Sequence, residues 1–157
     1  MKKKQIQIEY TEISSLEKLE PLEQRLVKKA KAAAKKAYAP YSNFFVGSAV
    51  LLENGEIFSG SNQENAAFPS GICAERTALF SAATTFPDVP VKTIVVTAIS
   101  NDKFVKSPIS PCGTCRQVIL QTQNRYSRKI RIILYAEEKS YVLDDAGLML
   151  PIPFDKF

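Results

Sequence analysis

The chain has 157 residues, a length that suits one domain with a sizeable core. Its residues are 45% hydrophobic and 24% charged, as in an ordinary globular protein, and no run approaches the roughly 20 apolar residues of a membrane span. The net charge of +5 comes largely from two lysine clusters without the aromatic series that a single-strand groove requires. We therefore expect neither a membrane nor a nucleic acid as partner. Because the N-terminus lacks a secretion signal, we place the protein in the cytoplasm.

The N-terminal part of the chain divides into an arm and a helix. Residues 5–10 alternate polar and apolar side chains, which predicts either an edge strand or a loosely attached segment. A helix is predicted from Pro21 to Tyr38, with Leu22, Leu26, Ala30, Ala33 and Ala37 on its apolar face and Pro40 beyond its end. We expect residues 1–20 to be an N-terminal arm and residues 21–157 to form the main domain.

The rest of the chain alternates strands and helices. Asn54-Gly55 predicts a hairpin turn, and Ser110 and Pro111 suit the N-cap and first position of the last helix, which ends near Asn124. This order predicts an α/β fold of three layers, α/β/α, with helices on both faces of a mixed five-stranded sheet. The predicted strands are 46–52, 57–60, 92–99, 130–135 and 140–143, and the second helix covers 73–83.

All three cysteines lie in two segments that open predicted helices, Gly71–Arg76 and Ser110–Arg116. Three thiolates fill three corners of a zinc tetrahedron and leave the fourth to water. The chain has no histidine, which excludes Ser-His and Cys-His catalysis and leaves sulfur and carboxylate as zinc ligands. The sequence therefore predicts a hydrolase with zinc ligands at Cys73, Cys112 and Cys115.

Other interpretations of these residues stay open. Cys112-x-x-Cys115 at a helix start also suits a dithiol redox pair, and Cys73 alone suits a small core residue. Glu75 favours catalysis, because an unpaired carboxylate in an apolar helix is costly unless it has a function. A structural ion pair between Glu75 and a neighbouring cation is the alternative. Two cations are available to donate hydrogen bonds to the sulfurs, Arg76 and Arg116.

The two motifs resemble those of the short cytidine deaminases, a family of homotetrameric pyrimidine nucleoside aminohydrolases. The motifs are Cys73-Ala74-Glu75-Arg76-Thr77-Ala78 and Ser110-Pro111-Cys112-Gly113-Thr114-Cys115-Arg116-Gln117-Val118. They supply the all-cysteine form of the zinc deaminase signature, and the resemblance runs from about Leu22 to Phe154. It implies a cytidine deaminase-like fold, one Zn²⁺ per subunit, and hydrolysis of cytidine and 2′-deoxycytidine to uridine, 2′-deoxyuridine and ammonia.

The resemblance also implies roles for single residues. Glu75 would move protons between water, the ring N3 and the departing ammonia, with Arg76 next to the ligands. Phe68 stands where relatives often carry tyrosine. The residues matched to substrate binding are Phe44, which stacks on the base, Asn62 and Glu64, which bind the sugar hydroxyl, Ala74, whose backbone contacts the base, and Phe154, whose ring closes over a site in a neighbouring subunit of a homotetramer.

Two rival functions differ in what they require. Deamination of another cytosine-bearing compound, such as a nucleoside antibiotic, would use the same site with a different substrate. An RNA-binding module with a structural zinc would need a fourth protein ligand, for which only a carboxylate such as Glu75 is available.

Overall fold

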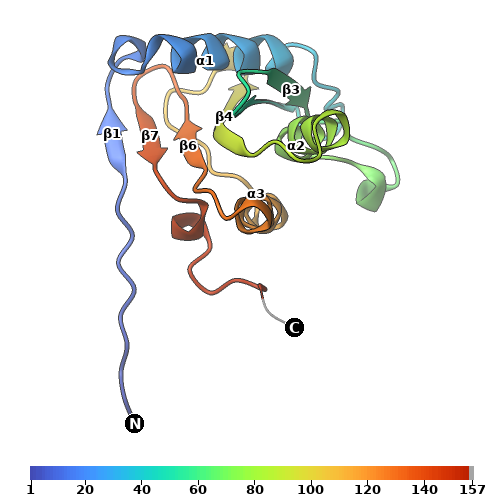
Figure 1. The fold of residues 1–157 in the computed structure, drawn as a ribbon. Coiled ribbons are helices and arrows are strands. Elements are labelled where there is room, and N and C mark those ends of the chain that lie inside the picture. The colour runs from blue at the N-terminus through green and yellow to red at the C-terminus, as the bar shows by residue number, and fades with distance from the viewer. Residues whose placement is uncertain (156–157) are drawn as a thin grey trace.

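A mixed β-sheet lies between two helical layers in the computed structural model, which describes residues 1–155 (Figure 1). One layer is a single helix and the other contains two. The main helices are α1 (Pro21–Ala34), α2 (Ala74–Thr85) and α3 (Gly113–Tyr126). The strands are β1 (Thr11–Ile13), β2 (Phe44–Leu52), β3 (Ile57–Ser61), β4 (Val91–Ser100), β5 (Lys103–Phe104), β6 (Arg131–Leu134) and β7 (Ser140–Leu143).

The sheet has seven strands in the order β1-β7-β6-β4-β2-β3, with β5 paired to β4. The β4–β6 pair is parallel and the other pairs are antiparallel, so the predicted mixed three-layer architecture is confirmed. The predicted strand number of five is wrong by two short strands. β5 has two residues after a turn at Asn101 and Asp102, both with positive φ, and β1 has three residues. Neither is long enough to show an alternating pattern in the sequence.

The central strands are buried on both faces because each contributes alternate side chains to two cores. On β2, for example, Ala49 and Leu51 face α1, whereas Val50 and Leu52 face α2 and α3. The β2–β3 hairpin has the predicted turn, with Gly55 at a φ of 87°. The core under α1 includes Leu19, Leu26, Val27, Ala30, Val95, Ile133 and Val142.

Helix α1 ends at Ala34, earlier than the predicted Tyr38. The reason is a competing set of partners: Tyr38 N–H donates to Asn62 O at 3.0 Å, and Glu64 N–H donates to Tyr38 O at 2.8 Å. Leu22 is 40% exposed, so its predicted place on the buried face is also wrong. The lysines of the helix lie mainly on its exposed side, as predicted.

Two glycines allow helices to approach the sheet closely. A Cβ on Gly47 would lie 2.1 Å from Ala30 O of α1, and a Cβ on Gly60 would lie 2.6 Å from Ala74 O of α2. Any side chain at Gly60 would therefore displace the first turn of α2. This close approach sets the position of the helix that follows Cys73.

The N-terminal arm extends away from the sheet, with residues 1–10 exposed and outside any strand (Figure 1). Residues 5–10, for which an edge strand or a loosely attached segment was predicted, form no strand, and the edge strand β1 begins directly after them at Thr11. The proposed domain of residues 21–157 includes positions 156–157, which lie outside the described residues. Every helix among residues 1–155 is too short or too polar to cross a membrane.

Candidate metal centre and active site

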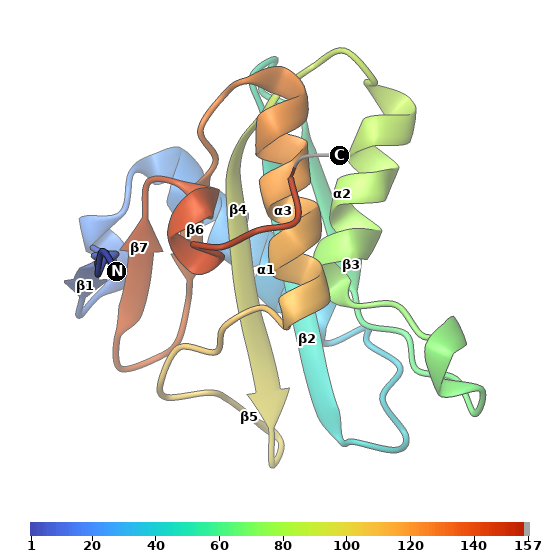
Figure 2. The ribbon, with the colours of Figure 1, turned by 90° about the horizontal axis from the view of Figure 1, so that it is seen from below.

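Helices α2 and α3 lie next to each other on the same face of the sheet, with their N-termini at the same end (Figure 2). Each helix begins after a cysteine: Cys73 is the N-cap of α2 and Cys112 the N-cap of α3. The N-cap predicted at Ser110 is therefore wrong, because the Ser110 hydroxyl instead accepts a hydrogen bond from Arg116 at 2.8 Å. The unpaired N–H groups of both helix ends favour negative charge at this end of the sheet.

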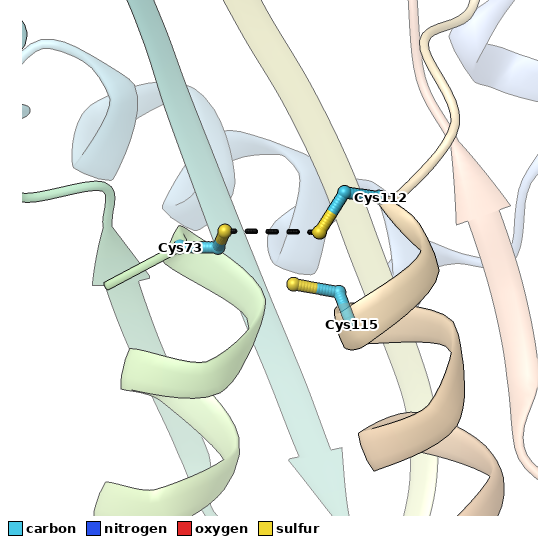
Figure 3. A group of neighbouring side chains, drawn as sticks. All are labelled: Cys73, Cys112 and Cys115. Atoms are coloured by element: carbon cyan, nitrogen blue, oxygen red, sulfur yellow. Dashed lines mark hydrogen bonds between the residues drawn. The ribbon is translucent and has the colours of Figure 1, made fainter. Parts of the chain in front are cut away.

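The three thiols converge between these helix ends (Figure 3). The Sγ atoms of Cys73, Cys112 and Cys115 all lie within 4.8 Å of one another, and those of Cys73 and Cys112 are 3.9 Å apart. Four ligands at the usual zinc–sulfur distance of about 2.3 Å in a tetrahedron are separated by about 3.8 Å. The donor set and its spacing therefore fit a tetrahedral zinc ion with one position left for a non-protein ligand.

The same geometry is less suited to a simple dithiol pair. All three cysteines are free, and the thiol next to Cys112 belongs to a different helix from the Cys112-x-x-Cys115 motif. A redox pair needs only two sulfurs, so it would not explain why the third thiol lies beside them. Its convergence favours metal binding over disulfide exchange.

Negative charge in the thiol cluster concentrates on one sulfur. The hydrogen bond with Cys115 and the Arg76 guanidinium 3.8 Å away together outweigh burial and lower the pKa of the Cys73 thiol to about 5. The same contact with Cys73, together with burial, raises the pKa of Cys115. Because metal-bound cysteines are thiolates, metal binding here has to release the remaining protons.

Glu75 lies in the first turn of α2 and is only 4% exposed. Burial raises the pKa of its carboxyl, and the negative charge of Cys73 adds to this effect. A carboxyl that holds its proton more tightly than an exposed glutamate suits both proton donation and proton acceptance near neutral pH. Ala74, between Cys73 and Glu75, is fully buried.

Arg76 and Arg116 have different surroundings. Arg76 Nη2 approaches the Cys73 sulfur, as expected, while its buried Nε has no hydrogen-bond partner among the described residues. Arg116 donates from Nε to Pro111 O at 2.8 Å and from Nη1 to Met149 O at 3.3 Å. The sequence-based idea that Arg116 bonds to a sulfur is therefore wrong, and Arg116 instead ties the start of α3 to the C-terminal segment.

A hollow of about 500 Å³ opens beside Cys73, a size typical of small-molecule sites. It brings together three of the expected site residues, Asn62, Glu64 and Cys73, with Arg76. Phe44, Ala74, Glu75 and Phe154 are not among its lining residues. The remaining lining residues are Tyr41, Ser42, Gln63, Asn65, Phe68, Gly71 and Ile72.

The expected sugar-binding pair also organises the loops around this hollow. The Asn62 side chain donates to Phe44 O at 2.9 Å and accepts from Val46 N–H at 2.7 Å, so it holds the start of β2. The Glu64 carboxylate accepts hydrogen bonds from Ser42 and from Tyr41 N–H, and these bonds lower its pKa. Both side chains retain acceptor or donor capacity for a ligand.

Phe154 lies on the C-terminal segment, on the outer side of α3. Its backbone N–H and C=O bond to the Gln117 amide at 3.2 and 2.7 Å, and its side chain is 71% exposed. Phe154 is therefore mostly exposed and does not line the hollow of its own chain.

Comparison with known proteins identifies the family of the chain. The model of the cytidine and deoxycytidylate deaminase zinc-binding region matches residues 21–129. The chain belongs to this family. It is 43% identical over 101 residues to a cytidine deaminase of Sporosarcina psychrophila, covering 64% of this chain and 70% of the relative. A cytidine deaminase of Halalkalibacterium halodurans is 43% identical over 98 residues, covering 62% and 70%.

Solved structures of the family share the fold. The crystal structure of cytidine deaminase from Burkholderia pseudomallei superposes with a TM-score of 0.71 at 40% identity, covering 83% of this chain and 97% of that one. Cytidine deaminase from Mycobacterium tuberculosis gives a TM-score of 0.65 at 27% identity, covering 84% and 96%. These matches confirm the cytidine deaminase-like architecture predicted from the sequence.

Sequence reasoning missed several residues of the hollow in this deaminase. Tyr41 and Ser42 line it from the loop before β2, and the Tyr41 ring contacts Phe68 with centroids 5.5 Å apart. Ser42 and Glu64 are 22 positions apart, so their hydrogen bond has no local signal in the sequence. Phe68 is 72% exposed and also lines the hollow.

Proposed function

We propose that the protein hydrolyses cytidine and 2′-deoxycytidine to the uracil nucleosides, with one zinc ion per subunit held by Cys73, Cys112 and Cys115. The observation that carries this proposal is the convergence of the three thiols, within 4.8 Å, at the helix end that also carries buried Glu75. The reaction forms a C4–O bond from water and breaks the C4–N bond, releasing ammonia. Zinc, when bound, lowers the pKa of a water that it coordinates toward neutrality.

Glu75 supplies the proton transfers in this proposal. The carboxylate takes a proton from water and gives it to the ring N3, and a second transfer delivers a proton to the departing amine. Burial of Glu75 raises its pKa, which brings the carboxyl toward the range in which both transfers are efficient. Arg76, beside Cys73, offsets part of the negative charge of three thiolates.

The remaining residues bind and orient the nucleoside. Asn62 and Glu64 offer an amide and a carboxylate to the sugar hydroxyl at the hollow, and Ala74 offers backbone groups to the base. Phe44, held by Asn62, stacks on the pyrimidine. Phe154 covers the hollow of a neighbouring subunit, which is consistent with its exposed ring and with a homotetramer.

This arrangement suits residues 21–157 as the catalytic domain, with residues 1–20 as an arm. Three free cysteines and a zinc cage require a reducing compartment, which supports a place in the cytoplasm. The structural-zinc alternative has less support, because only the three cysteines form a candidate metal cluster among residues 1–155.

The test is an assay of purified, zinc-loaded protein with cytidine, 2′-deoxycytidine and a panel of other cytosine nucleosides. Loss of cytosine absorbance with ammonia release is expected for the first two compounds. If the protein turns over neither compound, the proposal is refuted. If it turns over only another member of the panel, that compound is the substrate instead. Zinc is measured per chain in the same preparation, with about one ion expected for a three-thiolate site.

A further inference from the structure

The N-terminal arm leaves the sheet at an open edge. β1 pairs with β7 only over Thr11–Ile13, and β1 is the last strand on its side of the sheet. β7 ends at Leu143, so the segment before Thr11 continues past the end of its neighbour (Figure 1). An extended segment whose backbone groups lack a neighbouring strand is a template for pairing with another chain.

The arm also has one apolar face. Ile6, Ile8 and Tyr10 alternate with polar residues and are 55%, 49% and 54% exposed. Tyr10 packs against the Tyr141 ring with centroids 4.6 Å apart, which places this face on the α3 side of the sheet. About half of each of the three apolar side chains thus remains available for burial.

We propose that this arm pairs with the same arm of a second copy of the chain, as antiparallel strands about a two-fold axis at Ile8. Ile8 then faces the partner's Ile8, and Ile6 faces the partner's Tyr10. Because the two strands are identical, the contact between Ile6 and Tyr10 occurs twice, once on each side of the axis, as a closed two-fold interface requires. The apolar faces of both arms lie on the same side of the joined sheet.

Charge complementarity supports this register. Lys4 faces the partner's Glu12, whose carboxylate also lies 3.4 Å from Lys139 of its own chain, and the contact is repeated by symmetry. Gln7 faces the partner's Glu9, and no cation faces a cation. Opposite charges across antiparallel strands stabilise the pair, whereas like charges destabilise it.

Neighbouring registers are less favourable. A shift by one residue turns the apolar face of one arm onto the polar face of the other. A shift by two residues in one direction brings the two Glu9 carboxylates opposite each other. A shift by two in the other direction lets Glu12 face the partner's Lys2, but it places the Tyr10 ring opposite Lys4 and leaves it without an apolar partner. The register centred on Ile8 satisfies both the apolar and the charged positions.

The pairing leaves the candidate active site open. β1 and β3 lie at opposite ends of the sheet order, and the hollow is lined by residues 41–76 on the β3 side. The arm contact is therefore a separate interface, and its test does not depend on zinc or on deamination.

A disulfide at the symmetry axis tests the proposal directly. In full-length, zinc-loaded Ile8→Cys, the two new thiols should meet, because facing residues of antiparallel strands are about 4.5–5.5 Å apart. Gln5→Cys is the matched control on the same exposed arm, because Gln5 makes none of the proposed charge contacts and its two copies would be about 20 Å apart. Under mild oxidation, Ile8→Cys should form a covalent dimer roughly tenfold faster than the control variant. The unsubstituted protein shows how much cross-linking comes from the native thiols. Equal rates for the two variants would overturn the proposal.

A charge exchange tests the register in solution. Lys4→Glu and Glu12→Lys should each weaken arm-dependent self-association by roughly tenfold, because each change replaces two attractions by two repulsions. The double variant Lys4→Glu/Glu12→Lys should restore it, as measured by sedimentation velocity over a concentration series. Single variants that self-associate normally, as expected if another protein's strand is the natural occupant, would contradict the proposal. A double variant as weak as the single variants would also contradict it.

Discussion

The start of α1 and the starts of α2 and α3 use their side chains in different ways. Glu23 in the first turn of α1 accepts the backbone N–H of Glu20 at 3.2 Å, and Pro21 occupies a position where no N–H is required. Cys73 and Cys112, the N-caps of α2 and α3, make no side-chain capping hydrogen bond to the backbone N–H groups of their own helices. The first arrangement stabilises a helix, and the second directs sulfur toward the neighbouring helix.

The difference shows how function and local stability compete at a helix start. Cysteine is not among the preferred N-cap residues, and a missing cap costs about 1 kcal/mol of helix stability. Two adjacent helices with this defect concentrate unpaired N–H groups around three sulfurs. The proposed metal offsets the defect, since its binding free energy contributes to folding.

The largest effect, a loss of zinc affinity, is expected when an N-cap cysteine is replaced by serine, a preferred N-cap residue. Cys112→Ser should lower zinc affinity by more than about 10²-fold, because even the loss of an outer hydrogen-bond partner of a ligand costs 10–100-fold. Without metal, the same variant should be more stable than the unsubstituted protein by about 0.5–1 kcal/mol, because serine is a better N-cap. Competition with a chromophoric chelator measures the affinity, and urea unfolding in chelator measures the stability. Retention of normal zinc affinity would remove Cys112 from the ligand set.

The next largest effect, on turnover rate, distinguishes Glu75 in the first turn of α2 from Glu23 in the first turn of α1. Glu75→Gln should keep zinc and lose about 10²–10⁴-fold in turnover rate, the usual worth of general acid–base catalysis. Its free energy of unfolding should not fall, because burial disfavours the ionised form that is removed. Steady-state kinetics, metal analysis and urea unfolding give the three values.

Glu23→Gln is the matched control on α1. Glu23 is 7% exposed and bonds to Arg131 at 2.7 Å, so this variant should lose about 1–3 kcal/mol of stability without loss of turnover rate at 25 °C. Near-normal turnover in Glu75→Gln would exclude Glu75 from the chemistry. Equal losses of rate in both variants would show that neither carboxylate is specific to catalysis.

A smaller effect on stability and zinc binding is expected from the close packing of Gly60, on β3, against the first turn of α2. Gly60→Ala places a Cβ 2.6 Å from Ala74 O and Ala78 N, and should destabilise the fold by about 1–3 kcal/mol while weakening zinc binding. Gly113→Ala, at the start of α3, meets no atom within 4 Å and should be neutral or stabilise by up to about 1 kcal/mol. Thermal unfolding and zinc titration of both variants make the comparison. Equal behaviour would show that close packing at Gly60 does not position α2.

The smallest expected effect is a pH dependence of the unfolding free energy caused by Asp145. Asp145 caps the 3-10 helix Ala146–Met149: although burial raises its pKa, bonds from Gln123, Gly147 N–H and Lys129 lower it overall. A lowered pKa means that this stabilisation is present above the ordinary aspartate value of about 3.9 and is lost as the pH falls through the folded value. Between about pH 5 and pH 2, urea midpoints should fall more in the unsubstituted protein than in Asp145→Asn. Parallel curves would show that this carboxylate does not contribute to acid sensitivity.

Much of the architecture follows from local patterns. The strand β4 was predicted because its β-branched run suits a strand buried on both faces, and the β2–β3 turn because Asn54-Gly55 favours positive φ. The thiol cluster followed from cysteines at helix starts. These features depend on residues close together in the sequence or on a single spacing.

The errors came from contacts between distant segments. The end of α1 depends on bonds between Tyr38 and the loop at 62–64. At the start of α3, Arg116 bonds both to the nearby Ser110 hydroxyl and to the distant Met149 O. Leu22 has the spacing of a buried residue, but Glu23 takes the inward position because Arg131 pairs with it. A propensity pattern contains no term for such tertiary partners.

The separation of the thiols along the chain has a consequence for biosynthesis. Cys73 and Cys112 are 39 positions apart, and β4 lies between them in the sequence. During translation the first sulfur leaves the ribosome well before the other two, so the cage can be complete only after β4 and the start of α3 have been synthesised.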